Sequence, residues 1–234
     1  MQNRQIIEPK RSIDVIHETD VLVVGSGPGG LSAAIASARC GVKTTLLERF
    51  GCFGGNITVV GVEGFAWYRH EKTVEAGGIG REFEELAKEM GAAVPESQSL
   101  SYELDSEGFK LVADKLVMDS GIHPMLHRSF SMPIMEGNTV IGVIVESKAG
   151  REAILSKVVI DATGDADVAF RAGAQLNTMP VEELMATSVM FHLAGVDKKA
   201  FLSEIQNNPQ SYKDWSDSEW EVETDGKEND LFSP

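Results

Sequence analysis

The residues best suited to chemistry are a glycine-rich loop and an acid that follows it. The loop, residues 25–30, reads Gly25-Ser26-Gly27-Pro28-Gly29-Gly30 and fits the pattern G-x-G-x-x-G. In this pattern Gly25 permits a tight turn, Gly27 leaves room for a pyrophosphate, and Gly30 lets a helix pack closely on strands. Glu48 follows at the usual distance of about 20 residues, where a carboxylate accepts hydrogen bonds from a ribose diol and repels a 2′-phosphate. The pattern predicts a dinucleotide site that disfavours NADP.

The flanking sequence predicts the strand, helix and strand that must position this loop. Residues 21–24 are a short apolar run, typical of a buried parallel strand. A helix follows with an apolar face that Gly41 ends, and residues 42–47 read as a second strand. The free N–H groups and the dipole at the start of such a helix favour an anion. A glycine-rich turn without a ligand is the alternative, but it does not require these flanking elements.

A second strand end punctuated by glycine lies at residues 161–167. An apolar run leads into Ala162-Thr163-Gly164-Asp165, and a short helix is expected at residues 168–172. One interpretation makes Asp165 the N-cap of that helix. The other places Thr163, Gly164 and Asp165 beside the same diphosphate, because α/β sheets bind ligands at the carboxyl ends of their strands.

The loop at residues 49–64 contains Gly54-Gly55 followed by Asn56, which would let backbone approach a flat or charged group closely. A mobile hairpin turn is the alternative. An aromatic and cationic stretch at residues 65–70 follows it. There Arg69 could hold a carboxylate and His70 could act as an acid or base, unless these side chains only serve packing or the surface.

The remaining elements are expected in chain order. Amphipathic helices are expected at residues 79–90 and 105–120, and a short strand at 122–126. Residues 128–162 read as three antiparallel strands with turns near Asn138 and Gly150. An apolar stretch at residues 185–194 predicts a strand that opens a new sheet, and the acidic residues 214–234 are expected to be loosely held or disordered.

Composition narrows the class of protein. The chain has 234 residues and a net charge of −15, which argues against nucleic acid and anionic membranes as partners. Two cysteines make no disulfide framework, and no run of about 18 apolar residues occurs, so a cytoplasmic protein is expected. The sequence has no H-E-x-x-H, no C-x-x-C and no clustered carboxylates at metal-site spacing, so no metal is predicted.

Taken together, these motifs resemble the N-terminal half of the FAD-dependent oxidoreductase family, within the glutathione-reductase-like superfamily of two-motif flavoproteins. The resemblance covers about residues 15–200 and rests on residues 21–48, 126–130 and 158–174 with the Gly54-Gly55 loop. It implies an α/β fold: a Rossmann-like FAD-binding domain with a parallel sheet and flanking helices, plus an antiparallel β-meander. The expected organisation is an arm at residues 1–19, this domain at 20–175 with its meander at about 128–162, and part of a substrate or cap domain at 176–234.

The resemblance also implies the cofactor, FAD, and the residues that bind it. Gly25, Gly27 and Gly30 would lie under the pyrophosphate, Glu48 at the ribose and the backbone of Phe130 near the adenine. The full set expected at the cofactor is Gly25, Ser26, Gly27, Pro28, Gly29, Gly30, Glu48, Arg49, Gly55, Asn56, Phe130, Ala162, Thr163, Gly164 and Asp165. Members of the family are usually much longer, so a homo-oligomer or a missing C-terminal half is expected.

The function expected is flavin-mediated hydride or electron transfer to or from a small-molecule substrate. Two alternatives stay open. One is a non-catalytic dinucleotide-binding module or a split flavoprotein subunit that needs a partner, which the short chain favours. The other is an NAD-dependent dehydrogenase, against which the second motif and the meander weigh.

Overall fold

The computed structural model describes residues 5–64, 69–70, 73–74, 77–95, 101–185 and 187–208. The chain divides into two compact units, residues 1–188 and 189–234. The first unit holds the sheet and the predicted motifs. In the second unit, the described residues contain one helix, α5 (Lys198–Asn207), which Asp197 caps by accepting hydrogen bonds from the N–H groups of Lys199 and Ala200.

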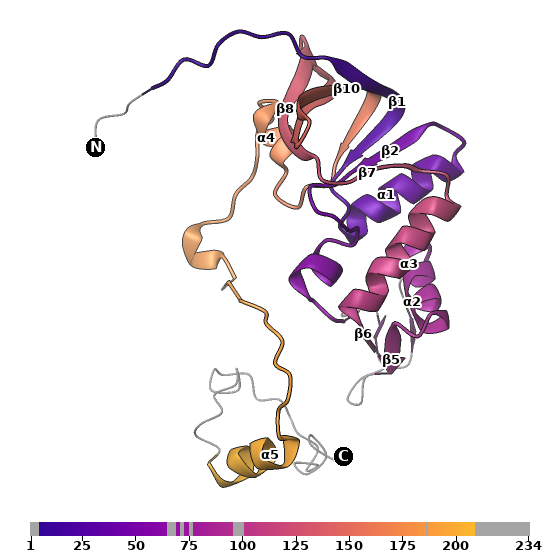
Figure 1. Cartoon of the computed structure of the whole chain (residues 1–234), viewed down its shortest axis with the longest axis vertical. Helices are drawn as coiled ribbons and strands as arrows, with labels where there is room; N and C mark the ends of the chain where they lie inside the picture. The colour runs from indigo at the N-terminus through magenta and orange to yellow at the C-terminus, as the bar shows by residue number, and fades with distance from the viewer. Residues whose placement is uncertain are drawn as a thin grey trace. The chain divides into compact units, whose positions relative to one another are not determined.

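The centre of the first unit is a six-stranded sheet with the order β7-β2-β1-β10-β9-β8 (Figure 1). Its strands are β1 (Val15–Val24), β2 (Thr44–Leu47), β7 (His123–Met125), β8 (Ser129–Glu136), β9 (Thr139–Ser147) and β10 (Gly150–Asp161). β1 pairs in parallel with β2 and β10, and β2 with β7, whereas β8, β9 and β10 pair antiparallel. The predicted α/β fold with a parallel sheet and an antiparallel meander is confirmed.

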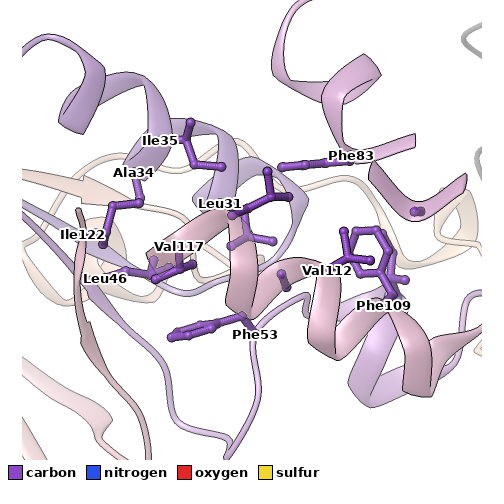
Figure 2. Close-up of a cluster of buried hydrophobic side chains, with 14 of the residues drawn as sticks. Leu31, Ala34, Ile35, Leu46, Phe53, Phe83, Phe109, Val112, Val117 and Ile122 are labelled. Atoms are coloured by element: carbon purple, nitrogen blue, oxygen red, sulfur yellow. The ribbon is translucent and has the colours of Figure 1, made fainter. Parts of the chain in front are cut away.

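Alternation along β1 divides the core between the two faces of the sheet. Val23 is buried on one face, and its neighbours Leu22 and Val24 are buried on the other. Helices α1 (Pro28–Arg39), α2 (Ile79–Glu89) and α3 (Ser106–Asp119) gather on the face of Val23 (Figure 1). Figure 2 shows their apolar side chains meeting there, with Leu31 and Ile35 of α1 near Phe83 of α2 and Val117 of α3.

The other elements of the first unit are short. They comprise β3 (Arg69–His70), β4 (Thr73–Val74), β5 (Ala93–Pro95), β6 (Tyr102–Leu104), α4 (Asp167–Arg171), a π-helical turn (Asn56–Val60) and a 3₁₀ turn (Val181–Glu183). β3 pairs with β4, and β5 with β6, as two antiparallel ribbons. α4 packs against β8 and β10, away from the three long helices (Figure 1).

Several local expectations need correction. Residues 49–64 are not loop throughout, because Asn56–Val60 forms the π-helical turn. The strand expected at residues 185–194 does not form among its described residues, where Met185 and Val189 are 94% and 86% exposed, since an apolar run becomes a strand only beside a partner. The aromatic residues 65–68 and the acidic stretch 214–234 lie outside the described residues.

Across the described ranges, no helix combines the length and the apolar character that crossing a membrane requires.

Candidate dinucleotide-binding site

A cavity of about 810 Å³ opens where β1, β2 and β10 end. Most of the residues expected at a cofactor line it: Gly25, Ser26, Gly27, Pro28, Gly29, Gly30, Glu48, Arg49, Gly55, Asn56, Phe130, Ala162, Thr163 and Gly164. Asp165 is exposed and is not among the lining residues. Three separate glycine-containing segments therefore meet at one hollow, as parallel strands with a shared carboxyl edge require.

Close backbone approach explains two of the glycines. Gly25 has a φ of +97°, and a Cβ there would lie 2.3 Å from the carbonyl oxygen of Ala162. Gly55 has a φ of +55°, and its Cβ would lie 2.6 Å from Cα of Gly27. A side chain at either position would clash with this backbone and would need a left-handed conformation. The segments that contain Ala162 and Gly55 can therefore lie against the first glycine loop only while Gly25 and Gly55 remain glycine.

The start of α1 leaves an open space beside free backbone donors. A Cβ on Gly27 or Gly29 would meet no atom within 4 Å, so these positions border empty volume. Pro28 is the first helical residue and has no N–H, and the N–H of Leu31 bonds to the carbonyl of Gly27. The N–H groups of Gly29 and Gly30 are thus the ones that the first turn offers to an anion.

Glu48 is a buried carboxylate in the cavity wall, with 6% of the residue exposed. Its Oε2 accepts hydrogen bonds from the N–H of Ser26 at 2.9 Å and from the Ser26 hydroxyl at 2.5 Å. Its Oε1 accepts from the N–H of Phe50 at 2.9 Å. The end of β2 and the first glycine loop are therefore joined through this side chain, and the carboxylate is fixed in orientation before any ligand arrives.

Two arginines lie near Glu48. The guanidinium of Arg49 lies over the ring of Phe50, 4.6 Å from its centroid. Arg128 lines the cavity, and its Nε lies 3.3 Å from Oε2 of Glu152. The backbone N–H of Arg128 donates to the backbone carbonyl of Glu48 at 3.0 Å. This hydrogen bond connects the segment after β7 to the end of β2.

The second motif is organised by Asp161, which the sequence analysis did not single out. Its carboxylate accepts from the N–H and the hydroxyl of Thr163, at 3.1 and 2.8 Å, and from the N–H of Ala169 at 2.8 Å. The Thr163 hydroxyl in turn accepts from the N–H of Asp167 at 2.8 Å. The interpretation of Asp165 as the N-cap is wrong: Ala166 occupies that position, and Thr163 and Asp161 accept from the N–H groups of Asp167 and Ala169 in α4.

Arg69 and His70, the candidates for substrate contact, form β3, where their backbones pair with Val74 and Thr73. Their side chains lie outside the described part of the structure. Their role therefore stays a prediction.

The cavity has further lining residues that the sequence analysis missed: Val24, Leu47, Phe50, Val59, Val60, Arg128, Ser129, Asp161, Ala166, Asp167 and Ala169. Asp161 had a readable signal, since an aspartate two residues before a threonine commonly accepts its N–H in a turn. Arg128 and Ser129 directly precede Phe130, so their position followed from that assignment. Val59 and Val60 had no signal, because the helical turn that carries them was read as loop.

Comparison with known proteins gives a family match over nearly the whole chain. The model of the family described as "FAD dependent oxidoreductase" matches residues 20–232. The thiamine thiazole synthase of Metallosphaera sedula is 34% identical over 160 residues, which cover 64% of this chain and 55% of that protein. The thiamine thiazole synthase of Saccharolobus islandicus is 33% identical over 162 residues, covering 64% and 57%. The chain spans only about half the length of these curated relatives.

Solved structures share the fold at low identity. A geranylgeranyl bacteriochlorophyll reductase-like protein from Thermoplasma acidophilum superposes with a TM-score of 0.50 and 21% identity, covering 68% of this chain and 43% of that one. L-proline dehydrogenase from P. horikoshii gives a TM-score of 0.50 and 13% identity, covering 69% and 57%. At these identities the likeness speaks for the fold alone.

Proposed function

The chain belongs to the family of FAD-dependent oxidoreductases, and on that premise we propose that its first unit binds FAD in the cavity at the ends of β1, β2 and β10. The observation that carries the proposal is the convergence of the two motifs and the Gly55 loop on that cavity. A dinucleotide needs an anion site and a ribose acceptor on one continuous surface, and this wall supplies both.

The residues present fit this cofactor. The diphosphate would lie over the start of α1, where Gly27 and Gly29 leave open space and the N–H groups of Gly29 and Gly30 are available. Glu48 would accept from the adenosine ribose, with Arg49 and the backbone of Phe130 beside the adenosine. The remaining contacts proposed, in the same cavity lining, are Gly55, Asn56, Ala162, Thr163 and Gly164. Asp165 also belongs to the proposed set, but it is exposed and does not line the cavity, so it has the least structural support of these contacts.

The reaction proposed is an oxidation or reduction of a small-molecule substrate. When bound, the flavin supplies the hydride or electron transfer. The chain itself contributes binding and orientation: the dipole of α1 faces the diphosphate, and the buried Glu48 fixes one end of the cofactor. Arg69 and His70 remain the proposed substrate contacts, holding a carboxylate and moving a proton.

The similarity to thiamine thiazole synthases concerns only part of each chain. It covers 64% of this chain and 55% of the first relative, so we carry over neither their product nor their substrates. The alternative of a subunit that completes its site with a second chain or a C-terminal half is supported by the same partial coverage. Gel filtration separates a chain that binds FAD by itself from a subunit that needs a partner. The first elutes with its cofactor, whereas the second does so only when the partner is present.

Titration of the purified chain with FAD and, separately, with NAD tests the proposal. Tighter binding of FAD than of NAD is the expected result, since the second motif and the antiparallel strands are the features that favour FAD. The variant that tests the second motif is Thr163→Val. It removes the hydroxyl that donates to Asp161 and accepts from the N–H of Asp167. It should weaken FAD binding if the second motif borders the cofactor. The proposed site is contradicted if the wild-type chain and Thr163→Val bind FAD with equal affinity, or if the wild-type chain prefers NAD to FAD.

A further inference from the structure

Ser26, the second residue of the glycine loop, makes a contact that its position in the motif does not require. The residue is fully buried at 0% exposure. Both its N–H and its hydroxyl donate to the same oxygen of Glu48, Oε2, at 2.9 and 2.5 Å. The other oxygen, Oε1, receives one protein donor, the N–H of Phe50 at 2.9 Å.

The number of acceptor positions left on Glu48 follows from these three bonds. An ionised carboxylate offers about four positions, two on each oxygen. Ser26 fills both positions of Oε2, and Phe50 fills one of those on Oε1. A single position on Oε1 is therefore left for a ligand in the cavity that Glu48 lines.

From this count we infer that Glu48 accepts a hydrogen bond from only one of the two hydroxyls of the adenosine ribose, and that Ser26 is the positioning residue that withholds Oε2 from the other. The inference rests on the proposed binding of FAD. It adds to that proposal a selectivity for one ribose hydroxyl.

Energetics favour Ser26 keeping its bond to Glu48 when a ligand enters. A hydrogen bond to an ionised carboxylate is stronger than one to a neutral hydroxyl, so exchanging Glu48 for a ribose oxygen would weaken the bond that the serine makes. Because Ser26 is fully buried, turning its hydroxyl away from Glu48 would also leave a desolvated donor to be satisfied elsewhere.

The test uses ADP, the adenosine diphosphate half of the cofactor, and its 2′-deoxy and 3′-deoxy analogues. Isothermal titration calorimetry measures their binding to the full chain, together with that of FAD. In the wild-type protein, one deoxy analogue should bind about tenfold or more weakly than ADP, and the other within about twofold of it.

Ser26→Ala should change this pattern by freeing one position on Oε2. The second deoxy analogue should then also bind about tenfold more weakly than ADP, because the ribose hydroxyl that it lacks gains an acceptor on Oε2 in this variant. Ser37→Ala, which lies in α1 and outside the cavity lining, should keep the wild-type pattern. A merely structural role for Ser26 would weaken all three ligands equally and leave their ratios unchanged.

Equal losses for both deoxy analogues in the wild-type protein, or unchanged ratios in Ser26→Ala, overturn the inference. If Ser26→Ala does not fold, the wild-type comparison of the two analogues decides alone. Absence of FAD binding refutes the proposed function and the inference with it, whereas FAD binding with equal losses refutes only the inference.

Discussion

Replacing Gly27 by alanine should separate cofactor binding from folding. Gly27 has φ −60° and ψ 176°, which alanine adopts readily, and its new Cβ would meet no protein atom within 4 Å. Alanine lowers the entropy of the unfolded chain but is a poorer residue before a helix, so the free energy of unfolding should change by less than about 1 kcal/mol.

The effect of Gly27→Ala on FAD should be much larger. The added methyl group would enter the space beside the N–H groups of Gly29 and Gly30, where we propose that the diphosphate lies. Losing one hydrogen bond to a charged group costs about 1.5–3 kcal/mol, which corresponds to roughly tenfold to a hundredfold weaker binding. Equilibrium titration with FAD measures this loss, and thermal unfolding verifies that the variant is folded.

Gly80→Ala is the matched control for this prediction. Gly80 lies in α2, away from the cavity lining, and a Cβ there would likewise meet no atom within 4 Å. Its affinity for FAD should equal that of the wild-type chain. If Gly27→Ala binds FAD as tightly as Gly80→Ala does, the diphosphate does not lie over the start of α1 and the proposed cofactor geometry is wrong.

Two further predictions concern stability. Asp161→Asn should lower the free energy of unfolding by about 1–3 kcal/mol, because an amide cannot accept from all three donors that the carboxylate satisfies; a thermal midpoint equal to the wild type would contradict this. His17 has a pKa lowered from its ordinary value of 6.5 by burial, with the charges of His123 and Lys43 adding to the effect. The unfolded chain therefore takes up the proton first, so stability should fall as the pH drops through about 6.5 and level off below the lowered pKa. Thermal unfolding across this range should show a weaker pH dependence in His17→Gln, and an identical dependence would exclude the role of His17.

The strand, helix and strand around the glycine loop could be predicted because their signals are local. The apolar run before Gly25 and the apolar face of α1 are set by neighbouring residues, and both appear in the core. The three antiparallel strands were equally readable, since Gly150 turns the chain between β9 and β10 at the expected place.

Features that depend on distant partners could not be predicted in this way. The apolar residues 185–194 have strand composition, but the described ones among them have no neighbouring strand and form none. The antiparallel pairing of β5 with β6 joins two segments of three residues each, which are too short to show an alternation of apolar and polar residues. Asp165 looked like the N-cap of α4 from its spacing, yet Thr163 and Asp161 reach the helix instead.

The candidate site was predictable in its outline because parallel strands carry their loops to one edge of the sheet. Gly25, Glu48 and Ala162 each follow a strand, and the cavity unites them. The finer connections, such as the bond from Ser26 to Glu48, depend on side-chain directions that strand spacing does not reveal. The boundary near residue 175 and the substrate contacts at Arg69 and His70 stay predictions.

The central claim, that this chain binds FAD, is tested most directly by the visible absorption spectrum of the purified protein after FAD is added and the sample is passed through gel filtration. The account predicts that the two absorption bands of a flavin elute with the protein. A protein that retains no flavin and binds NAD without affinity for FAD would contradict it.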